Sequence, residues 1–149
     1  NLLSSPCDPD YVLDGDGRIA LYRAAGNQHI DVVRILCAAG ANKERGDRFG
    51  ATPLHRAARE GHLDVVQFLV ESGANKESAA QDGYTPLHTA AREGHLDVVQ
   101  FLVESGANKE SANRYGATPL YVAADQGHLG VVQFLVESGA NKESATQNG

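Results

Sequence analysis

The chain repeats itself every 33 residues, and this period constrains its fold more than any other feature of the sequence. Three nearly identical frames follow one another without insertion or deletion, and a more divergent copy precedes them. The complete frames are residues 14–46, 47–79, 80–112 and 113–145. Residues 1–13 look like the end of an earlier copy, and residues 146–149 begin a later one. This pattern predicts that residues 1–149 form a single domain in which similar units stack in a row.

Each frame contains the signals of a short first helix. In the frame 47–79 this helix begins at Thr52-Pro53, because a threonine hydroxyl can accept a hydrogen bond from a free backbone N–H and proline fits the first helical position. Residues 54–58 then carry an apolar stripe with helical spacing. Gly61 is suited to the left-handed conformation that ends a helix.

A longer and more apolar second helix follows at residues 63–70 and ends at Gly73. Residues 74–84 are mostly polar or small, with Gly83 at a turn, which favours a hairpin-like loop. Neither helix is long enough to be stable alone in water. Each must bury its apolar stripe against the next copy, so the frames predict a solenoid stabilised by the repeats and by the interfaces between them.

The period and the segment Thr52-Pro53-Leu54-His55-Arg56-Ala57 resemble the ankyrin repeat. Residues 85–90 carry a similar motif, and residues 118–123 carry it with Tyr121 in the histidine position. The resemblance implies an all-α solenoid of stacked ankyrin-type helix-turn-helix repeats with β-hairpin fingers, used as a protein-binding module. The first repeat departs from the family pattern, because residues 19–22 replace the Thr-Pro-Leu-His segment and remove the capping pair.

The near-identical frames differ from one another mainly on one side of the repeat. Frames 47–79 and 80–112 differ only in the finger and the first helix, whereas residues 65–79 are unchanged in both later copies. The ankyrin resemblance places the variable positions on the concave face, the family's usual binding surface. Exposed positions can also simply drift, but the second-helix residues Gln67 and Glu71 should be equally exposed and do not vary. We therefore predict that the variable face binds a partner.

Aromatic residues and arginine gather on this predicted binding face, and tyrosine and arginine are enriched at interface hot spots. Acidic residues such as Asp16, Asp47 and Glu60 lie among them, so the face is mixed rather than basic. The candidate partner-binding residues are Arg18, Arg23, Arg48, Phe49, Arg56, Arg59, Gln81, Asp82, Tyr84, Thr89, Arg92, Arg114, Tyr115, Val122, Asp125 and Gln126.

Histidine recurs at two positions of the repeat, represented by His55 and His62. Equivalent side chains on stacked helices lie about 8–10 Å apart, whereas zinc ligands must converge within about 2 Å of one ion. A catalytic site is also needed once, not in every copy. We therefore expect no enzymatic activity and no metal or cofactor, and we expect these histidines to bond the backbone of turns between repeats.

The composition narrows the classes of partner. The chain carries 13 Lys and Arg against 19 Asp and Glu, a net charge of −6, whereas nucleic-acid-binding proteins usually carry a basic excess. No apolar run approaches the roughly 20 residues that span a bilayer. We therefore expect neither a nucleic-acid partner nor a membrane. Cys7 and Cys37 are too few for a disulfide framework, and we expect reduced thiols in an intracellular, cytoplasmic protein, although the sequence leaves a bridge between them open.

The predicted function is non-catalytic binding of another protein through the concave face. Two alternatives stay open. Copies this alike also fit an engineered ankyrin scaffold without a native partner, and the chain can instead be a structural fragment that associates with itself. Self-association is expected at the C-terminal end, because Val132, Phe134 and Val136 repeat the apolar residues of internal copies and no complete repeat follows them.

Overall fold

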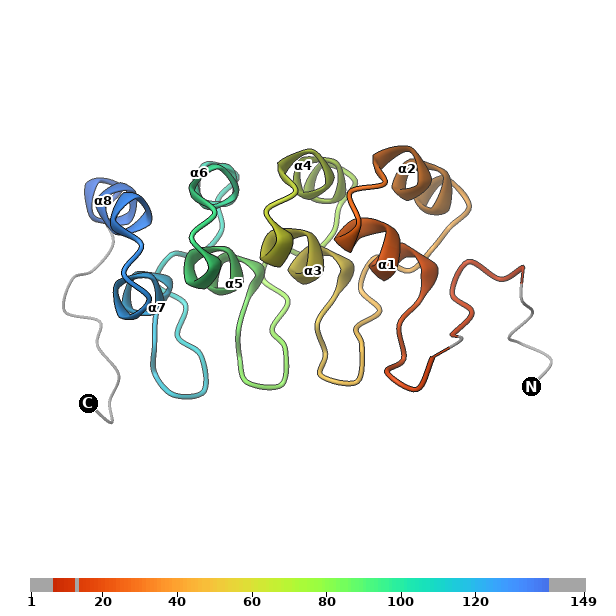
Figure 1. Ribbon diagram of the computed structural model, residues 1–149, viewed down its shortest axis with the longest axis horizontal. Helices are drawn as coiled ribbons and strands as arrows, with labels where there is room; N and C mark the ends of the chain where they lie inside the picture. Colours follow the sequence, from red (N-terminus) through yellow and green to blue (C-terminus); the bar gives the residue numbers. More distant parts are fainter. Residues whose placement is uncertain (1–6, 13, 140–149) are drawn as a thin grey trace.

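The computed structural model describes residues 7–12 and 14–139, so the expected end of the fourth repeat and start of a later one lie outside the described residues. Within the described residues the chain forms eight α-helices, two in each repeat (Figure 1). The first helices of the repeats are α1 (Ala20–Gly26), α3 (Pro53–Glu60), α5 (Pro86–Glu93) and α7 (Pro119–Asp125). The second helices are α2 (Ile30–Ala38), α4 (Leu63–Glu71), α6 (Leu96–Glu104) and α8 (Leu129–Glu137).

The helices form two layers (Figure 1). The first helices stand side by side in one layer and the second helices in the other, and each helix packs on its counterparts in the neighbouring repeats. The loops between repeats project from the first-helix layer, away from the second-helix layer. We term the tips of these loops fingers; they comprise residues 14–18, 47–51, 80–84 and 113–117. The arrangement confirms the predicted all-α solenoid of stacked helix pairs.

The first helices α3 and α5 begin at the predicted threonine caps. The hydroxyls of Thr52 and Thr85 accept hydrogen bonds from the N–H groups of His55 and His88. In return, Nδ1 of each imidazole accepts the threonine N–H, at 3.1 and 3.2 Å, so two free donors are satisfied at each helix start. Helix α1 begins after Ile19 with no side-chain cap, as its sequence predicts.

The same two helices end at glycines that the structure requires. Gly61 and Gly94 have φ angles of 75° and 80°, in the left-handed region that glycine adopts without strain. A Cβ atom at Gly94 would lie 2.5 Å from Nδ1 of His128, and one at Gly61 would lie 2.6 Å from Nδ1 of His95. Glycine is therefore needed both for the backbone turn and for the close approach of the next repeat.

A continuous core runs along the array and is built from small and aliphatic side chains. Ala57 and Ala58 are fully buried in α3, and their small size lets the first helices approach one another closely. Leu54, Val66 and Leu69 are also buried and fill the space around them. Full burial of one such aliphatic side chain contributes about 1.5–3 kcal/mol, so the short helices gain their stability from stacking.

The β-hairpin form expected of the fingers is not confirmed, because no β-strand forms within residues 7–12 and 14–139. Each finger is a tight turn. In the finger 47–51 the N–H of Asp47 donates to the carbonyl of Ala51 at 3.0 Å, and the N–H of Gly50 donates to the carbonyl of Asp47 at 2.9 Å. The next finger is joined to this one by the backbone bond from Gln81 N–H to the Phe49 carbonyl. A single bond between neighbours is too few for a strand ladder.

Residues 7–12 continue the stack at its N-terminal end. Asp10 accepts the N–H of Asn42 at 2.8 Å, and Glu44 of the first repeat accepts the N–H of Asn75 at 2.8 Å, although Asp10 lies one frame position before the counterpart of Glu44. The bond from Asn42 holds residues 7–12 against the first repeat.

Candidate protein-binding groove

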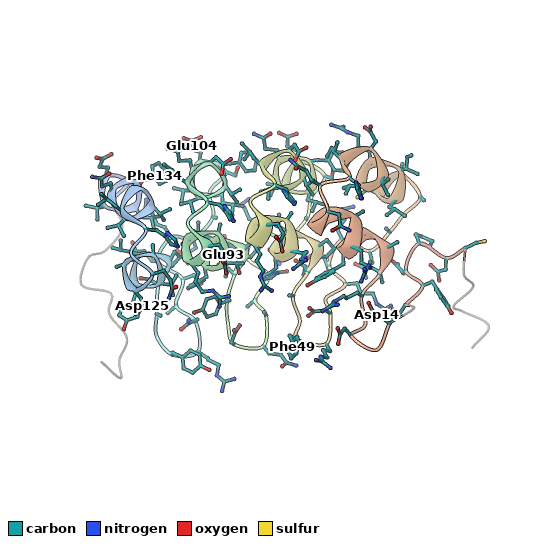
Figure 2. All side chains as sticks on the ribbon, in the orientation of Figure 1. Asp14, Phe49, Glu93, Glu104, Asp125 and Phe134 are labelled. Carbon is teal, nitrogen blue, oxygen red and sulfur yellow. The ribbon has the colours of Figure 1, made fainter. Side chains whose placement is uncertain are left out.

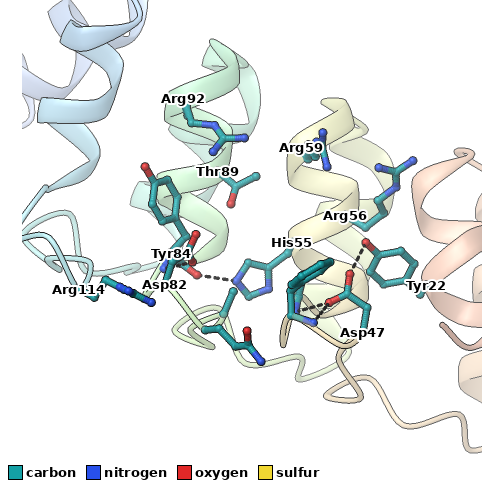
Figure 3. A pocket seen from close by; sticks show the side chains of 14 residues that line it. Tyr22, Asp47, His55, Arg56, Arg59, Asp82, Tyr84, Thr89, Arg92 and Arg114 are labelled. Carbon is teal, nitrogen blue, oxygen red and sulfur yellow. Dashed lines mark hydrogen bonds between the residues drawn. The ribbon is translucent and has the colours of Figure 1, made fainter. Parts of the chain in front are cut away.

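A hollow of about 330 Å³ lies between the helices α3 and α5 (Figure 3). Residues of the fingers 47–51, 80–84 and 113–117 line its other side. We term it the concave groove. All candidate residues of the second and third repeats except Arg48 line it. Its full lining is Tyr22, Asp47, Phe49, Ala51, His55, Arg56, Arg59, Ala80, Gln81, Asp82, Tyr84, Thr89, Arg92 and Arg114.

Backbone hydrogen bonds hold the finger side of the groove in place. The N–H of Gln81 donates to the carbonyl of Phe49 at 2.9 Å, and the N–H of Arg114 donates to the carbonyl of Asp82 at 3.0 Å. Each bond links one finger to the next, so the side chains of consecutive fingers keep a defined separation. The groove is therefore formed by the stack itself, as expected for recognition loops on a rigid scaffold.

Tyr22 and Asp47 meet at the α1 end of the groove. The Tyr22 hydroxyl donates to Oδ2 of Asp47 at 3.1 Å, while Oδ1 accepts the N–H groups of Phe49 and Ala51 at 2.9 and 3.0 Å. Burial raises the pKa of Tyr22, and the negative charge of Asp47 raises it further, so the hydroxyl stays protonated and donates. Both carboxylate oxygens of Asp47 are therefore occupied by donors within the chain.

His55 and His88 tie each first helix to the following finger. Nε2 of His55 lies 2.8 Å from the carbonyl oxygen of Tyr84, and Nε2 of His88 lies 2.9 Å from that of Ala117. A carbonyl oxygen only accepts, so Nε2 carries the proton and Nδ1 accepts from the capping threonine. Burial lowers the pKa of both imidazoles, which favours this neutral form. The expectation that these histidines bond the backbone between repeats is confirmed.

The second set of histidines makes a similar connection between repeats. Nε2 of His62, His95 and His128 donates to the carbonyl oxygens of Gly26, Arg59 and Arg92 at 3.0, 2.8 and 2.8 Å. Each bond joins the start of a second helix to the end of the first helix in the preceding repeat. In the part of the chain that the structure describes, no three His, Cys, Asp or Glu side chains are placed to hold a metal ion, and no helix there is long and apolar enough to cross a membrane.

Arginine supplies most of the charge that lines the groove. The guanidinium of Arg56 lies 2.8 Å from a carboxylate oxygen of Glu60, and that of Arg92 lies 3.1 Å from one of Glu93. Among the described residues, no carboxylate oxygen lies within 4.0 Å of the guanidinium of Arg59. Arg59 thus presents an unpaired positive charge to the groove.

Apart from Val122, the remaining candidate residues lie outside the concave groove in three places. Arg18 and Arg23 line a smaller hollow of about 240 Å³ beside it, which shares Tyr22 and Arg56 with the groove. Two further candidates are exposed on the fingers, and two are exposed at the end of α7. These four residues are Arg48, Tyr115, Asp125 and Gln126.

Val122 was expected on the binding face, and this expectation is wrong. Its side chain on α7 is only 5% exposed and belongs to the core. The equivalent positions in the preceding repeats hold Arg56 and Thr89, which are half-buried and line the groove. A long arginine keeps its charged end in water, whereas the short apolar side chain of valine gains by staying buried.

Sequence reasoning missed Tyr22 and His55 as groove residues, and it placed Asp47 on the predicted binding face without naming it as a binding residue. Tyr22 occupies the frame position of the structural histidines, and its bond to Asp47 joins side chains from two different repeats. One signal was present in the sequence. Tyr22 replaces the histidine of its frame position, and the next frame begins with Asp47, whereas the two later frames begin with Ala80 and Asn113.

Comparison with known families agrees with this architecture. The family described as ankyrin repeats (3 copies) matches residues 1–80 and again residues 75–146, which together span nearly the whole chain. No curated protein matches the chain. Ankyrin repeats are generally protein–protein interaction modules and are typically non-catalytic. With the matching repeats, the stacked helix pairs and the threonine–proline caps in place, the chain belongs to the ankyrin repeat family.

Proposed function

We propose that the chain is a non-catalytic module that binds another protein through the concave groove and the fingers beside it. One observation carries this proposal. The second and third repeats differ at only five frame positions, and each of the five contributes at least one side chain to the lining of this single hollow. Random drift would also have changed the exposed positions of α4 and α6, which are identical. Variation confined to one groove fits a surface that is adapted to a partner.

Exposed aromatic side chains support the same surface. Phe49 is 51% exposed and Tyr115 is 52% exposed, both on fingers. Figure 2 shows Phe49 at the finger end of the molecule, opposite the second-helix layer that carries Glu104. Aromatic rings bury large areas when a partner covers them and are enriched among the residues that dominate binding energy.

The test compares variants on opposite faces of the array. The immobilised chain is used to retain proteins from an extract, mass spectrometry identifies them, and affinity is then measured with the purified partner. Substitutions Phe49→Ala and Tyr84→Ala should each cost on the order of 2 kcal/mol of binding energy. The control substitutions Glu71→Ala and Glu104→Ala, on the second helices, should leave binding unchanged. If the control variants abolish binding and the groove variants do not, the second-helix face is the site.

Self-association through the ends of the array is a second candidate. Ile35 of α2 is 68% exposed at one end, and Leu129 of α8 is 69% exposed at the other. In the interior, the equivalent residues Phe68 and Leu96 are partly buried against the core. A contact between the two different ends would be open and could extend, whereas a contact between two identical ends would close as a dimer.

An intracellular, cytoplasmic location is part of the proposal. Cys37 is not part of a disulfide in the structure, and burial raises the pKa of its thiol. Reduced thiols persist in reducing compartments, which supports this location.

A further inference from the structure

The concave groove offers more positive charge than its own acidic residues neutralise. Four arginines and two aspartates line it. Asp47 is one of the two, and both of its carboxylate oxygens already accept hydrogen bonds from Tyr22 and from the finger backbone. Glu60 and Glu93 pair with Arg56 and Arg92 from outside the lining. Among the described residues, Arg59 and Arg114 are the groove arginines with no carboxylate within 4.0 Å, so they are free to bind acidic groups of a ligand.

The positive charge concentrates at the helix side of the groove. Arg59 and Arg92 occupy the same frame position on α3 and α5, and Figure 3 shows both beside the groove at its helix side. Arg59 has no carboxylate within 4.0 Å among the described residues. Arg92 is held over the ring of Tyr84, 5.5 Å from the ring centre, and pairs with Glu93. That pair is half exposed, and exposed ion pairs contribute little, so Arg92 can exchange Glu93 for a ligand carboxylate.

The finger side is mixed in charge, because Arg114 lies there beside Asp82. Oδ1 of Asp82 accepts the N–H of Tyr84 at 3.2 Å, and its charge repels an acidic side chain that approaches this part of the groove. The rings of Phe49 and Tyr84 also lie here and offer apolar contact. At the frame position of Arg59 and Arg92, the fourth repeat carries Asp125 instead of an arginine. Acidic ligand groups are therefore favoured over the second and third repeats only.

We propose that the groove binds an extended, acidic segment of a partner protein, with aspartate or glutamate side chains at Arg59 and Arg92 and an apolar side chain beside Phe49 and Tyr84. Stacked helices lie about 8–10 Å apart, and an extended chain rises about 3.3 Å per residue, so the two acidic side chains lie two or three residues apart. This inference rests on the proposed function of the groove and adds the chemistry of the partner.

The test uses a displayed library of random, unmodified peptides selected on the immobilised full chain. Selected peptides should be enriched in aspartate or glutamate at this spacing. For the best synthetic peptide, Arg59→Gln should weaken binding about tenfold or more, because it removes a charge-assisted hydrogen bond, and should reduce the dependence of binding on salt. The matched control is Arg45→Gln, which removes the same charge from an exposed side chain that lines neither hollow. It should change affinity less than twofold.

The outcomes separate this inference from the proposed function. Peptides without acidic residues, no selectable peptide, or an Arg59→Gln variant that behaves like Arg45→Gln would each overturn the acidic-segment proposal. If Phe49→Ala and Tyr84→Ala still weaken the selected peptide in that case, the groove remains the binding site and only the chemistry is wrong. If those variants also bind normally, the proposed function fails as well. Unchanged thermal unfolding of Arg59→Gln shows that the variant is folded.

Discussion

Replacing His88 by alanine removes the side chain that joins the third repeat to the finger of the fourth. His88 is fully buried, its Nε2 lies 2.9 Å from the carbonyl oxygen of Ala117, and its Nδ1 accepts the N–H of Thr85 at 3.2 Å. The substitution leaves the buried N–H of Thr85 without a partner and leaves the Ala117 carbonyl with the N–H of Asn113 alone. It also removes the contact between the imidazole and the ring of Tyr84, whose centres are 5.4 Å apart.

The cost follows from these two groups. The unpaired N–H costs about 1–3 kcal/mol and the lost bond to the Ala117 carbonyl about 0.5–1.5 kcal/mol, so we expect His88→Ala to lower the free energy of unfolding by about 2–4 kcal/mol. The whole chain is expected to have a stability on the order of 10 kcal/mol, from about 0.05–0.15 kcal/mol per residue. The loss is therefore a large fraction of the total and should be seen first in α7 and α8, because a stacked array separates at its weakest interface.

Urea unfolding followed by circular dichroism measures this loss, and hydrogen exchange locates it. The control is His29→Ala, because His29 is exposed and makes no side-chain cap at the start of α2. Surface changes of this kind stay within about 0.5 kcal/mol. If His88→Ala costs less than about 1 kcal/mol, or no more than His29→Ala, the buried imidazole does not hold the repeats together and the reasoning is refuted.

Lowering the pH from about 7.5 to about 5 should destabilise the fold. Burial puts the folded-state pKa of His55 and His88 below the ordinary 6.5, so the unfolded chain binds protons first as the pH falls. The stability that the two neutral imidazoles contribute is therefore full above pH 6.5 and is lost as the pH falls below it, through the folded-state pKa. Urea titrations at several pH values measure the effect, and each imidazole should change the free energy of unfolding by at most about 1.4 kcal/mol per pH unit. A free energy of unfolding that does not change with pH contradicts the argument. A chelator should leave the thermal midpoint unchanged; a stoichiometric metal retained by the purified chain would show that the histidine spacing was misjudged. In sedimentation velocity the parent should associate as its concentration rises, whereas a variant with Ile35→Ser and Leu129→Ser should not, and a parent that stays monomeric throughout excludes association through the ends.

The fold could be predicted from the sequence because the repeat gives the same local signals several times. Thr52 and Pro53 mark a helix start, and Gly61 marks its end, through backbone chemistry that depends on neighbours in the chain. The histidine bonds could be anticipated for a similar reason, since a buried imidazole that recurs in stacked repeats needs a regular backbone partner.

The details of the groove depend on contacts between repeats, which periodicity does not reveal. Val122 shares a frame position with Arg56, yet one is buried and the other lines the groove, because an arginine keeps its charged end in water whereas an apolar valine gains by burial. The bond between Tyr22 and Asp47 depends on how helix α1 of the first repeat lies against the finger 47–51 of the second. Each finger closes through backbone bonds of its own and is joined to the next finger by a single backbone bond, and a single bond between fingers is too few for a ladder of strands.

The central claim is that the face formed by the fingers and first helices binds a partner protein. Hydrogen exchange of the chain, measured alone and in complex with the partner that it retains, tests this claim most directly. The account predicts that protection increases in residues 47–60 and 80–93, which contain two fingers and the helices α3 and α5. Protection confined to α4 and α6, with no change in those two segments, would contradict it.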